Sequence, residues 1–264
     1  MSAWTELDQL LDAAPGAWSA CVQLLDGTPV YDYAADIVRP SASLIKVPLA
    51  MALVASSRRQ GHEGVDLQVT ETLCEVDRVE GDGTFDGAPA GTSRTRWELI
   101  GHMLRESDNT AGNLLIRAIG MDTVNRFLAG PLLCLSTTRL RRHFMDFAAA
   151  AAGEENLITA REMCRILTLL AAEPEYACLR DWLAQSPYDE RLVAGVPIGI
   201  AVAHKVGDLT GVEHDAGIVY APCAPYIVAL LSAELPAPGD GSRTIAGASR
   251  LIYTLMTGSA LSSR

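Results

Sequence analysis

The residues of this chain best suited to chemistry are its two lysines, Lys46 and Lys205. The chain has 21 basic side chains, and arginine supplies all the others. Arginine stays protonated in proteins, whereas a buried lysine amine can lose its proton and act as a base. Codon bias accounts for the general use of arginine, so the two lysines mark positions where arginine would not serve. This pattern predicts proton transfer or a compact point charge at both positions.

Lys46 lies in an S-x-x-K motif, Ser43-Leu44-Ile45-Lys46. Pro40 and Ser41 precede it as a helix breaker and a candidate cap, so Ser43 falls in a first helical turn. Residues three apart share a helix face, which places the amine beside the Ser43 hydroxyl, where it can take the proton and activate the nucleophile. The motif arises by chance about once in a chain of this size. The alternative is a capping serine and a snorkelling lysine.

A second motif, Ser107-Asp108-Asn109, separates helices predicted over 96–106 and 110–119. As structure it is a cluster of cap-forming residues. As chemistry, Ser107 could relay a proton to a leaving nitrogen, and Asn109 could bind a substrate amide.

The third motif is Lys205-Val206-Gly207, at the end of an apolar strand. A solubilising lysine on an edge strand is the structural alternative. In a functional role the ammonium would lower the local proton affinity and attract a carboxylate, and Gly207 would let the strand backbone approach a substrate. Both lysines of the chain fall in these motifs. Purely structural roles for each motif do not account for this coincidence, so we prefer the functional interpretation of all three.

Together the three motifs resemble the signature set of the class A β-lactamases and penicillin-binding proteins, S-x-x-K, S-D-N and K-T-G. The likeness extends over nearly the whole chain, with the motifs in the same order and at similar spacing. It implies that Ser43 is the acylated nucleophile, Lys46 a base, Ser107 the proton relay and Lys205 the electrostatic partner.

The resemblance also implies which groups bind the substrate. The backbone N–H groups of Ser43 and Asp208 would form the oxyanion hole, with Asn109 and Gly207 beside the substrate. Neither a metal nor a cofactor is expected, and the five histidines lack metal spacing.

Two departures from the family pattern affect the expected chemistry. The class A enzymes carry a glutamate in an L-x-R-x-E-x-x-L-N loop that activates the deacylating water, and Phe144 stands at that position here. The nearest acid, Asp146, is shorter and two residues away, so acylation looks intact while hydrolysis of the acyl-enzyme should be slow. Val206 replaces a hydroxyl residue that helps to hold the β-lactam carboxylate, for which Arg243 or Thr210 could compensate.

The order of elements predicts an α/β (α+β) fold. Strand patterns occur near the N-terminus, with a hairpin at 18–25 and 29–34, and again at 200–206, 217–221 and 226–231. Helical patterns cover 5–13, 43–56, 96–106, 110–119, 122–129, 160–172, 176–185 and 242–256, around a Gly/Pro-rich loop at 80–95. We expect one antiparallel sheet built from both chain ends and flanked by helices, with an inserted all-helical lobe.

The expected lobes are residues 1–42 plus 196–264 for the sheet and 43–195 for the helices. The active site would lie in the cleft between them.

Composition limits the partners. A net charge of −11 disfavours nucleic acid and anionic membranes. No apolar run is long enough to span a bilayer, no secretory signal is evident, and the six cysteines show no disulfide or metal spacing. We expect a cytoplasmic protein, or a secreted or periplasmic one if a leader has been removed, acting on a small-molecule amide or ester. Its oligomeric state is open.

Three functions follow in order of preference. The first is a β-lactamase-like hydrolase of β-lactams or related cyclic or linear amides, with slow deacylation. The second is an acyl transferase, D-amino-acid peptidase or esterase of the same fold. The third, a non-catalytic acyl-binding protein, conflicts with the retention of both lysines.

Overall fold

A five-stranded antiparallel sheet forms the centre of the computed structural model, which describes residues 4–59, 64–81, 83–222 and 224–261. The strand order is β2-β1-β9-β8-β7. The strands are β1 (Ala17–Leu24), β2 (Pro29–Tyr33), β7 (Val202–Leu209), β8 (Val212–Val219) and β9 (Tyr226–Ala233). β1 pairs with β9 along its whole length, so the two ends of the chain meet in the middle of the sheet. This confirms the predicted architecture.

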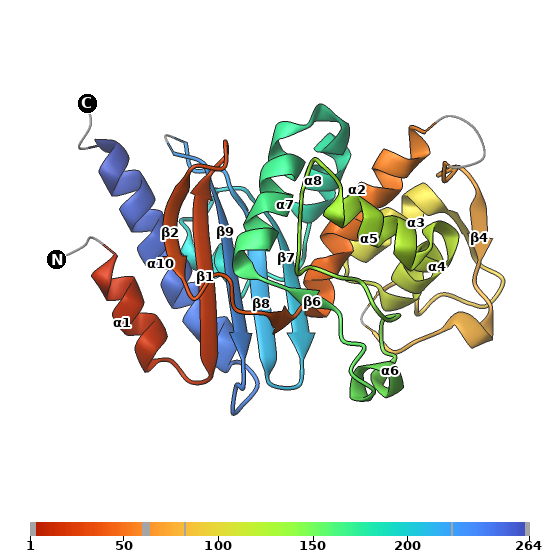
Figure 1. Cartoon of the computed structure of the whole chain (residues 1–264), viewed down its shortest axis with the longest axis horizontal. Coiled ribbons are helices and arrows are strands. Elements are labelled where there is room, and N and C mark those ends of the chain that lie inside the picture. The colour runs from red at the N-terminus through yellow and green to blue at the C-terminus, as the bar shows by residue number, and fades with distance from the viewer. Residues whose placement is uncertain (1–3, 60–63, 82, 223, 262–264) are drawn as a thin grey trace.

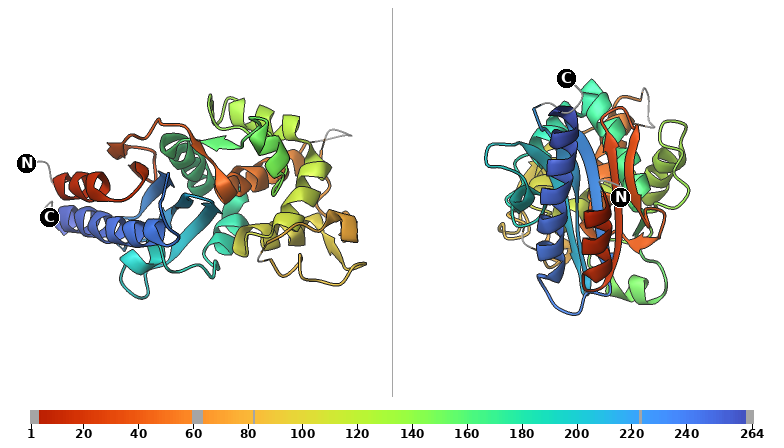
Figure 2. Two further views of the ribbon diagram at one scale, coloured as in Figure 1. Left: turned by 90° about the horizontal axis from the view of Figure 1, so that it is seen from below. Right: turned by 90° about the vertical axis from the view of Figure 1, so that its left-hand side faces the viewer.

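Helices cover both faces of the sheet (Figures 1 and 2). On one face lie α1 (Thr5–Ala13) and α10 (Asp240–Leu261), and on the other lies α7 (Ala160–Ala172). Alternate residues of β9 serve the two faces: Val228 and Leu230 join the cluster under α1 and α10, whereas Ala229 and Leu231 join the larger core. A strand buried on both faces is apolar throughout, and that is why this strand was easy to recognise in the sequence.

The middle of the chain is mainly helical, as predicted. Much of it lies beyond β7 (Figure 1), whereas its last helix, Leu192–Gly195, packs against α10. Its helices are α2 (Lys46–Ser57), α3 (Arg96–Arg105), α4 (Asn109–Ile119), α5 (Met121–Ala129), α6 (Phe147–Ala151), α8 (Ala177–Leu183) and α9 (Leu192–Gly195). Short 3-10 turns occur at Ala42–Ile45, Glu75–Asp77 and Pro174–Tyr176. Two small sheets pair β3 (Arg39–Pro40) with β6 (Leu157–Ile158), and β4 (Thr70–Thr72) with β5 (Ser93–Thr95).

Helix α2 runs through the interior, as its all-round apolar pattern predicted. The helix expected at 43–56 is confirmed, with a first turn that is a 3-10 helix, Ala42–Ile45, and an α-helical part that begins at Lys46. Ser43 still lies in a first helical turn. A left-handed residue, Ala42 (φ 44°), directly precedes it.

The start of β8 was missed, since the sequence predicted a strand only at 217–221. Its first half contains Glu213, His214 and Asp215, which are buried despite their polarity. Each has partners: for example, His214 Nε2 lies 2.8 Å from the Pro40 carbonyl oxygen, and the Asp215 carboxylate lies 2.9 Å from His204. A buried strand whose polar side chains are hydrogen-bonded in this way lacks the apolar run from which strands are predicted.

The division into a sheet lobe of 1–42 plus 196–264 and a helical lobe of 43–195 stays a prediction. Helix α7 falls within the second range and packs on the sheet. Among the described residues, no helix is long and apolar enough to cross a membrane.

Candidate active site

Ser43, in the 3-10 turn Ala42–Ile45, lies beside Lys46, the first residue of α2. The Lys46 amine is 3.1 Å from the Ser43 hydroxyl oxygen, as the i, i+3 spacing predicted. The lysine side chain is completely buried. It is therefore not a snorkelling surface residue.

The Ser107–Asn109 motif supplies the other partners of Lys46. The amine lies 2.6 Å from the Ser107 carbonyl oxygen, 3.2 Å from the Ser107 hydroxyl and 2.6 Å from Asn109 Oδ1. Ser107 adopts a positive φ of 60°, in the left-handed region, between α3 and α4. Asp108 caps α4 by accepting a hydrogen bond from the Ala111 N–H. The motif thus contains both a helix cap, at Asp108, and two groups that contact the lysine.

Burial lowers the pKa of Lys46 well below its ordinary value, and the charge of Lys205 lowers it further against the opposing effect of Asp108. A neutral amine has two hydrogens and one lone pair. The two short contacts, to Ser107 O and Asn109 Oδ1, fit the two hydrogens. The lone pair then remains for the proton of Ser43. The geometry matches a base poised at a serine hydroxyl.

Lys205 is the second buried lysine, on strand β7. Its amine donates to the Val206 carbonyl oxygen at 3.1 Å and lies 6.0 Å from the centre of the Tyr188 ring. Burial lowers the pKa of Lys205 to about 7, with Asp208 and Asp215 opposing the shift. This lysine changes charge near neutral pH.

Gly207 brings the end of β7 against the nucleophile. A Cβ on Gly207 would lie 3.0 Å from Ala42 Cβ and 3.1 Å from the backbone nitrogen of Ser43. Both contacts are tighter than ordinary, so glycine permits the close approach. The oxyanion hole expected from the N–H groups of Ser43 and Asp208 stays a prediction.

The Phe144 loop (residues 140–148) covers the lysine from another side. The Phe144 ring centre lies 4.6 Å from the Lys46 amine. Asn113 holds the backbone of Phe144 through hydrogen bonds of 2.8 and 3.1 Å to its N–H and carbonyl. The ring lies so close to Gly112 that a Cβ there would be 2.6 Å from it. Asp146 is exposed and caps α6 by accepting from the Ala149 N–H at 3.0 Å.

These elements enclose a small cavity of about 50 Å³ beside Ser43, called here the Ser43 cavity. Its lining is Ala42, Ser43, Asn109, Arg142, Phe144, Met145, Phe147, Asn156, Asp208 and Leu209. Arg243 is not brought to it: the guanidinium is exposed and pairs with Asp240 at the start of α10. Thr210 lines a neighbouring cavity of about 330 Å³ that also includes Asp208.

Comparison with known proteins agrees with this geometry. The family described as the beta-lactamase enzyme family matches residues 2–256. The chain belongs to this family. The match covers all three motifs and supports a serine hydrolase of the β-lactamase type.

Individual relatives carry the same name. The chain is 32% identical to β-lactamase FAR-1 of Nocardia farcinica over 62% of its own length and 56% of that protein. It is 31% identical to a β-lactamase of Streptomyces fradiae over 85% of its length and 76% of that protein. The chain thus spans a little over half of the first relative and about three quarters of the second.

Solved structures share the fold. A β-lactamase from Sphaerobacter thermophilus aligns with a TM-score of 0.85 and 26% identity, over 96% of this chain and 98% of that one. The structure of PBP-A aligns with a TM-score of 0.85 at 24% identity, over 98% of this chain and 97% of that one, which shows the fold alone.

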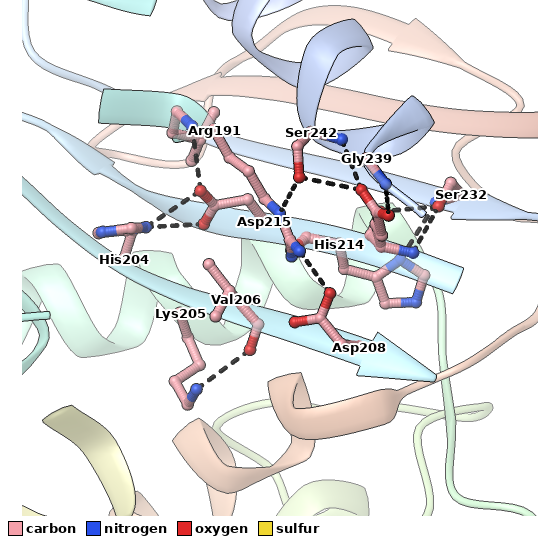
Figure 3. A network of polar contacts seen from close by, with 12 residues as sticks. Arg191, His204, Lys205, Val206, Asp208, His214, Asp215, Ser232, Gly239 and Ser242 are labelled. Atoms are coloured by element: carbon pink, nitrogen blue, oxygen red, sulfur yellow. Dashed lines mark hydrogen bonds and ion pairs between the residues drawn. The ribbon is translucent and has the colours of Figure 1, made fainter. Parts of the chain in front are cut away.

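In this member of the β-lactamase family, Arg191 lies beside the site, a position that the sequence analysis did not predict. Its guanidinium pairs with Asp208 and donates to the His214 carbonyl at 2.7 Å and to the Ser242 hydroxyl at 3.0 Å (Figure 3). Arg191 lies outside every strand and helix, so no pattern could have related it to the site. In the part of the chain that the structure describes, no cluster of His, Cys, Asp and Glu could hold a metal ion.

Proposed function

We propose that Ser43 attacks β-lactams or related cyclic or linear amides, and that the resulting acyl-enzyme hydrolyses slowly. Lys46 takes the Ser43 proton, Ser107 passes a proton to the leaving nitrogen, and the charge of Lys205 favours both steps. The N–H groups of Ser43 and Asp208 stabilise the oxyanion, and Asn109 binds the substrate amide.

One observation carries the acylation half of this proposal: the amine of the buried Lys46 lies 3.1 Å from the Ser43 oxygen. A base within hydrogen-bonding distance of a serine is the geometric requirement for nucleophilic catalysis. The Ser107 hydroxyl lies 3.2 Å from the same amine, which supports its role as a relay.

The Phe144 loop supports the slow second half. Phe144 presents an apolar ring to Lys46 where the family has a glutamate. Asp146 is engaged as a helix cap, and Glu155 pairs with Arg142 at 2.7 Å. The carboxylate that lines the Ser43 cavity belongs to Asp208, which is paired with Arg191. A water molecule near the ester therefore has no free carboxylate to activate it among the described residues of this lining.

The same observation favours an alternative within this fold, an acyl transferase or D-amino-acid peptidase. An acyl-enzyme that water attacks slowly can instead pass its acyl group to an amine.

Intact-protein mass spectrometry after incubation with β-lactams and activated acyl esters tests the proposal. We expect one adduct per chain on the wild-type protein and none on Ser43→Ala. An adduct that persists in Ser43→Ala, or that maps to another peptide, would overturn the assignment of the nucleophile. Adding an amine acceptor distinguishes the alternatives: faster loss of the adduct supports a transferase, and unchanged loss supports a hydrolase.

We also propose that the protein works in a reducing compartment. Cys21 and Cys164 are buried thiols, and Cys74, Cys134 and Cys178 are exposed thiols without a disulfide. Cell fractionation of the natural host tests this, because recovery with secreted proteins would contradict it.

A further inference from the structure

A carboxylate stands at the end of β7, next to the nucleophile. Asp208 follows Gly207, the residue whose backbone lies against Ser43, and it lines the Ser43 cavity together with Asn109 and Phe144. Its side chain is 54% exposed, and the residue also lines the neighbouring cavity that includes Thr210. A substrate acylating Ser43 from this side meets a negative charge.

The cations around the Ser43 cavity are already engaged. Arg191 is 6% exposed and pairs with Asp208, while its other donors bind the His214 carbonyl and the Ser242 hydroxyl (Figure 3). Arg142, which lines the cavity, is 5% exposed and pairs with Glu155. Neither guanidinium has an exposed, unpaired face to offer to an anion.

The remaining cations are no better placed to bind an anion. The Lys205 amine is buried and donates to the Val206 carbonyl, and Figure 3 shows it on the side of β7 away from Arg191. Val206 contributes no hydroxyl donor. Arg243 pairs with Asp240 in an exposed position and does not line the cavity.

Two further carboxylates lie on the neighbouring strand. Glu213 accepts hydrogen bonds from the Ser242 N–H and hydroxyl, at 2.6 and 2.9 Å, and Asp215 contacts His204. At this end of the sheet, three carboxylates (Asp208, Glu213 and Asp215) therefore lie close enough to interact with two cations, Arg191 and Lys205. The local balance does not favour a further anion, and a like charge placed directly beside an interface charge is strongly unfavourable.

We infer that Asp208 is a specificity-determining residue, which makes the enzyme prefer acyl substrates with an uncharged or cationic group at the β7 end over substrates with a carboxylate there. This inference rests on the proposed acylation of Ser43. Its physical basis is rejection of the wrong substrate by repulsion, which separates substrates as effectively as added attraction does. The pairing of Asp208 with Arg191 fixes the carboxylate in position.

A matched pair of probes tests the inference: benzylpenicillin, which carries a carboxylate, and the same molecule with that group converted to a carboxamide. The rate of Ser43 adduct formation is measured by mass spectrometry for both. We expect the wild-type protein to react faster with the carboxamide. We expect Asp208→Asn to raise the rate for the carboxylate by about tenfold, since a half-exposed charge is partly screened by solvent, and to change the carboxamide rate by less than about twofold.

Two variants serve as controls. Asp208→Glu keeps the charge and should keep the preference. Asp36→Asn removes one charge from another Asp–Arg pair, that with Arg161, which does not line the Ser43 cavity, and should leave both rates unchanged.

The outcomes separate the two proposals. If Ser43 reacts with both probes but prefers the carboxylate, or if Asp208→Asn alters both rates equally, the inference about Asp208 is overturned and the proposed acylation stands. If neither probe modifies Ser43 in any variant while activated esters do, the inference again fails and β-lactam acylation fails with it. If no reagent modifies Ser43, the proposed function itself is overturned.

Discussion

Two regions around Ser43 differ in how completely they are equipped for chemistry. On one side, four oxygen atoms lie within 3.2 Å of the Lys46 amine: the hydroxyls of Ser43 and Ser107, the Ser107 carbonyl and the Asn109 side-chain amide. On the other side, the Phe144 loop presents an aromatic ring to the same amine. The first region contains what acylation needs. The second lacks the carboxylate that family members use for deacylation.

The difference supports our proposal that fast acylation and slow deacylation are separated in this protein. The loop is not poorly built: Asn113 holds the Phe144 backbone, and Asn156 Oδ1 accepts from the Arg141 and Arg142 N–H groups at 2.7 and 3.0 Å. The structure thus holds an apolar ring firmly at the position where the family has its base. This arrangement supports the proposed long-lived acyl-enzyme.

The largest expected effect comes from the well-equipped side. Lys46→Arg replaces an amine that can lose its proton with a guanidinium that stays protonated, so acylation should slow by roughly 10²- to 10⁴-fold, the usual contribution of general-base catalysis. Adduct formation followed by mass spectrometry measures this. Because Lys46 is fully buried, a thermal melt must show that the variant folds. Full activity in a folded Lys46→Arg protein would remove the lysine as the base.

The next effect concerns the Phe144 loop. Phe144→Glu should speed adduct loss by about tenfold or more, and by more than it changes adduct formation, because general-base assistance to water is worth about 10²–10⁴-fold when well placed. Phe144→Leu is the matched control, since it opens similar space without a base and should change adduct loss by less than about threefold. Equal acceleration by leucine would show that the ring only blocks water.

Lys205 should produce a smaller effect that depends on pH. Its pKa is lowered to about 7, so the charge is present below that pH and lost above it. That charge helps to lower the pKa of Lys46, and its loss makes the Lys46 amine more basic and more often protonated. Acylation should therefore decline as pH rises past about 7 in the wild-type protein.

Lys205→Arg keeps the charge at high pH and should remove this alkaline decline, at the expense of about a tenfold lower maximum rate because the larger guanidinium is poorly matched to the buried position. An unchanged decline in Lys205→Arg would assign the titration to another group.

Asp146 should have the smallest effect. The sequence left open that it substitutes for the missing glutamate, but the structure engages its carboxylate as the cap of α6. Asp146→Asn preserves a capping side chain and should change adduct formation and loss by less than about twofold, whereas Asp146→Ala should lower the free energy of unfolding by about 1 kcal/mol. Slower adduct loss in Asp146→Asn would restore Asp146 as a base.

The fold and the acylating side could be predicted because their signals are local. The S-x-x-K spacing places two side chains on one helical turn, and apolar strands such as β9 are apparent from composition alone. The helix at 160–172 has the predicted bounds, where Thr159 caps it by accepting from the Glu162 N–H. Ser43, Lys46, Ser107 and Asn109 therefore came together as expected.

The rest depends on contacts between segments far apart in sequence. The charge pattern of Glu213, His214 and Asp215 hides a strand whose polar groups are satisfied from β7, β3 and the start of α10. Arg191 belongs to no motif, and its role is defined by the Asp208 that it meets. Arg243, predicted to compensate in carboxylate binding, instead pairs with Asp240. No spacing rule contains this information.

The most direct test of the central claim is a time course that follows Ser43 adduct and released product in the same β-lactam reaction, by mass spectrometry and absorbance. We predict a burst of about one product per chain, full conversion of the protein to its adduct, and a steady state whose rate equals the rate of adduct loss. Rapid turnover with no burst and no accumulated adduct would contradict the claim, because it would require an efficient deacylating base, and the described residues that line the Ser43 cavity offer no free carboxylate.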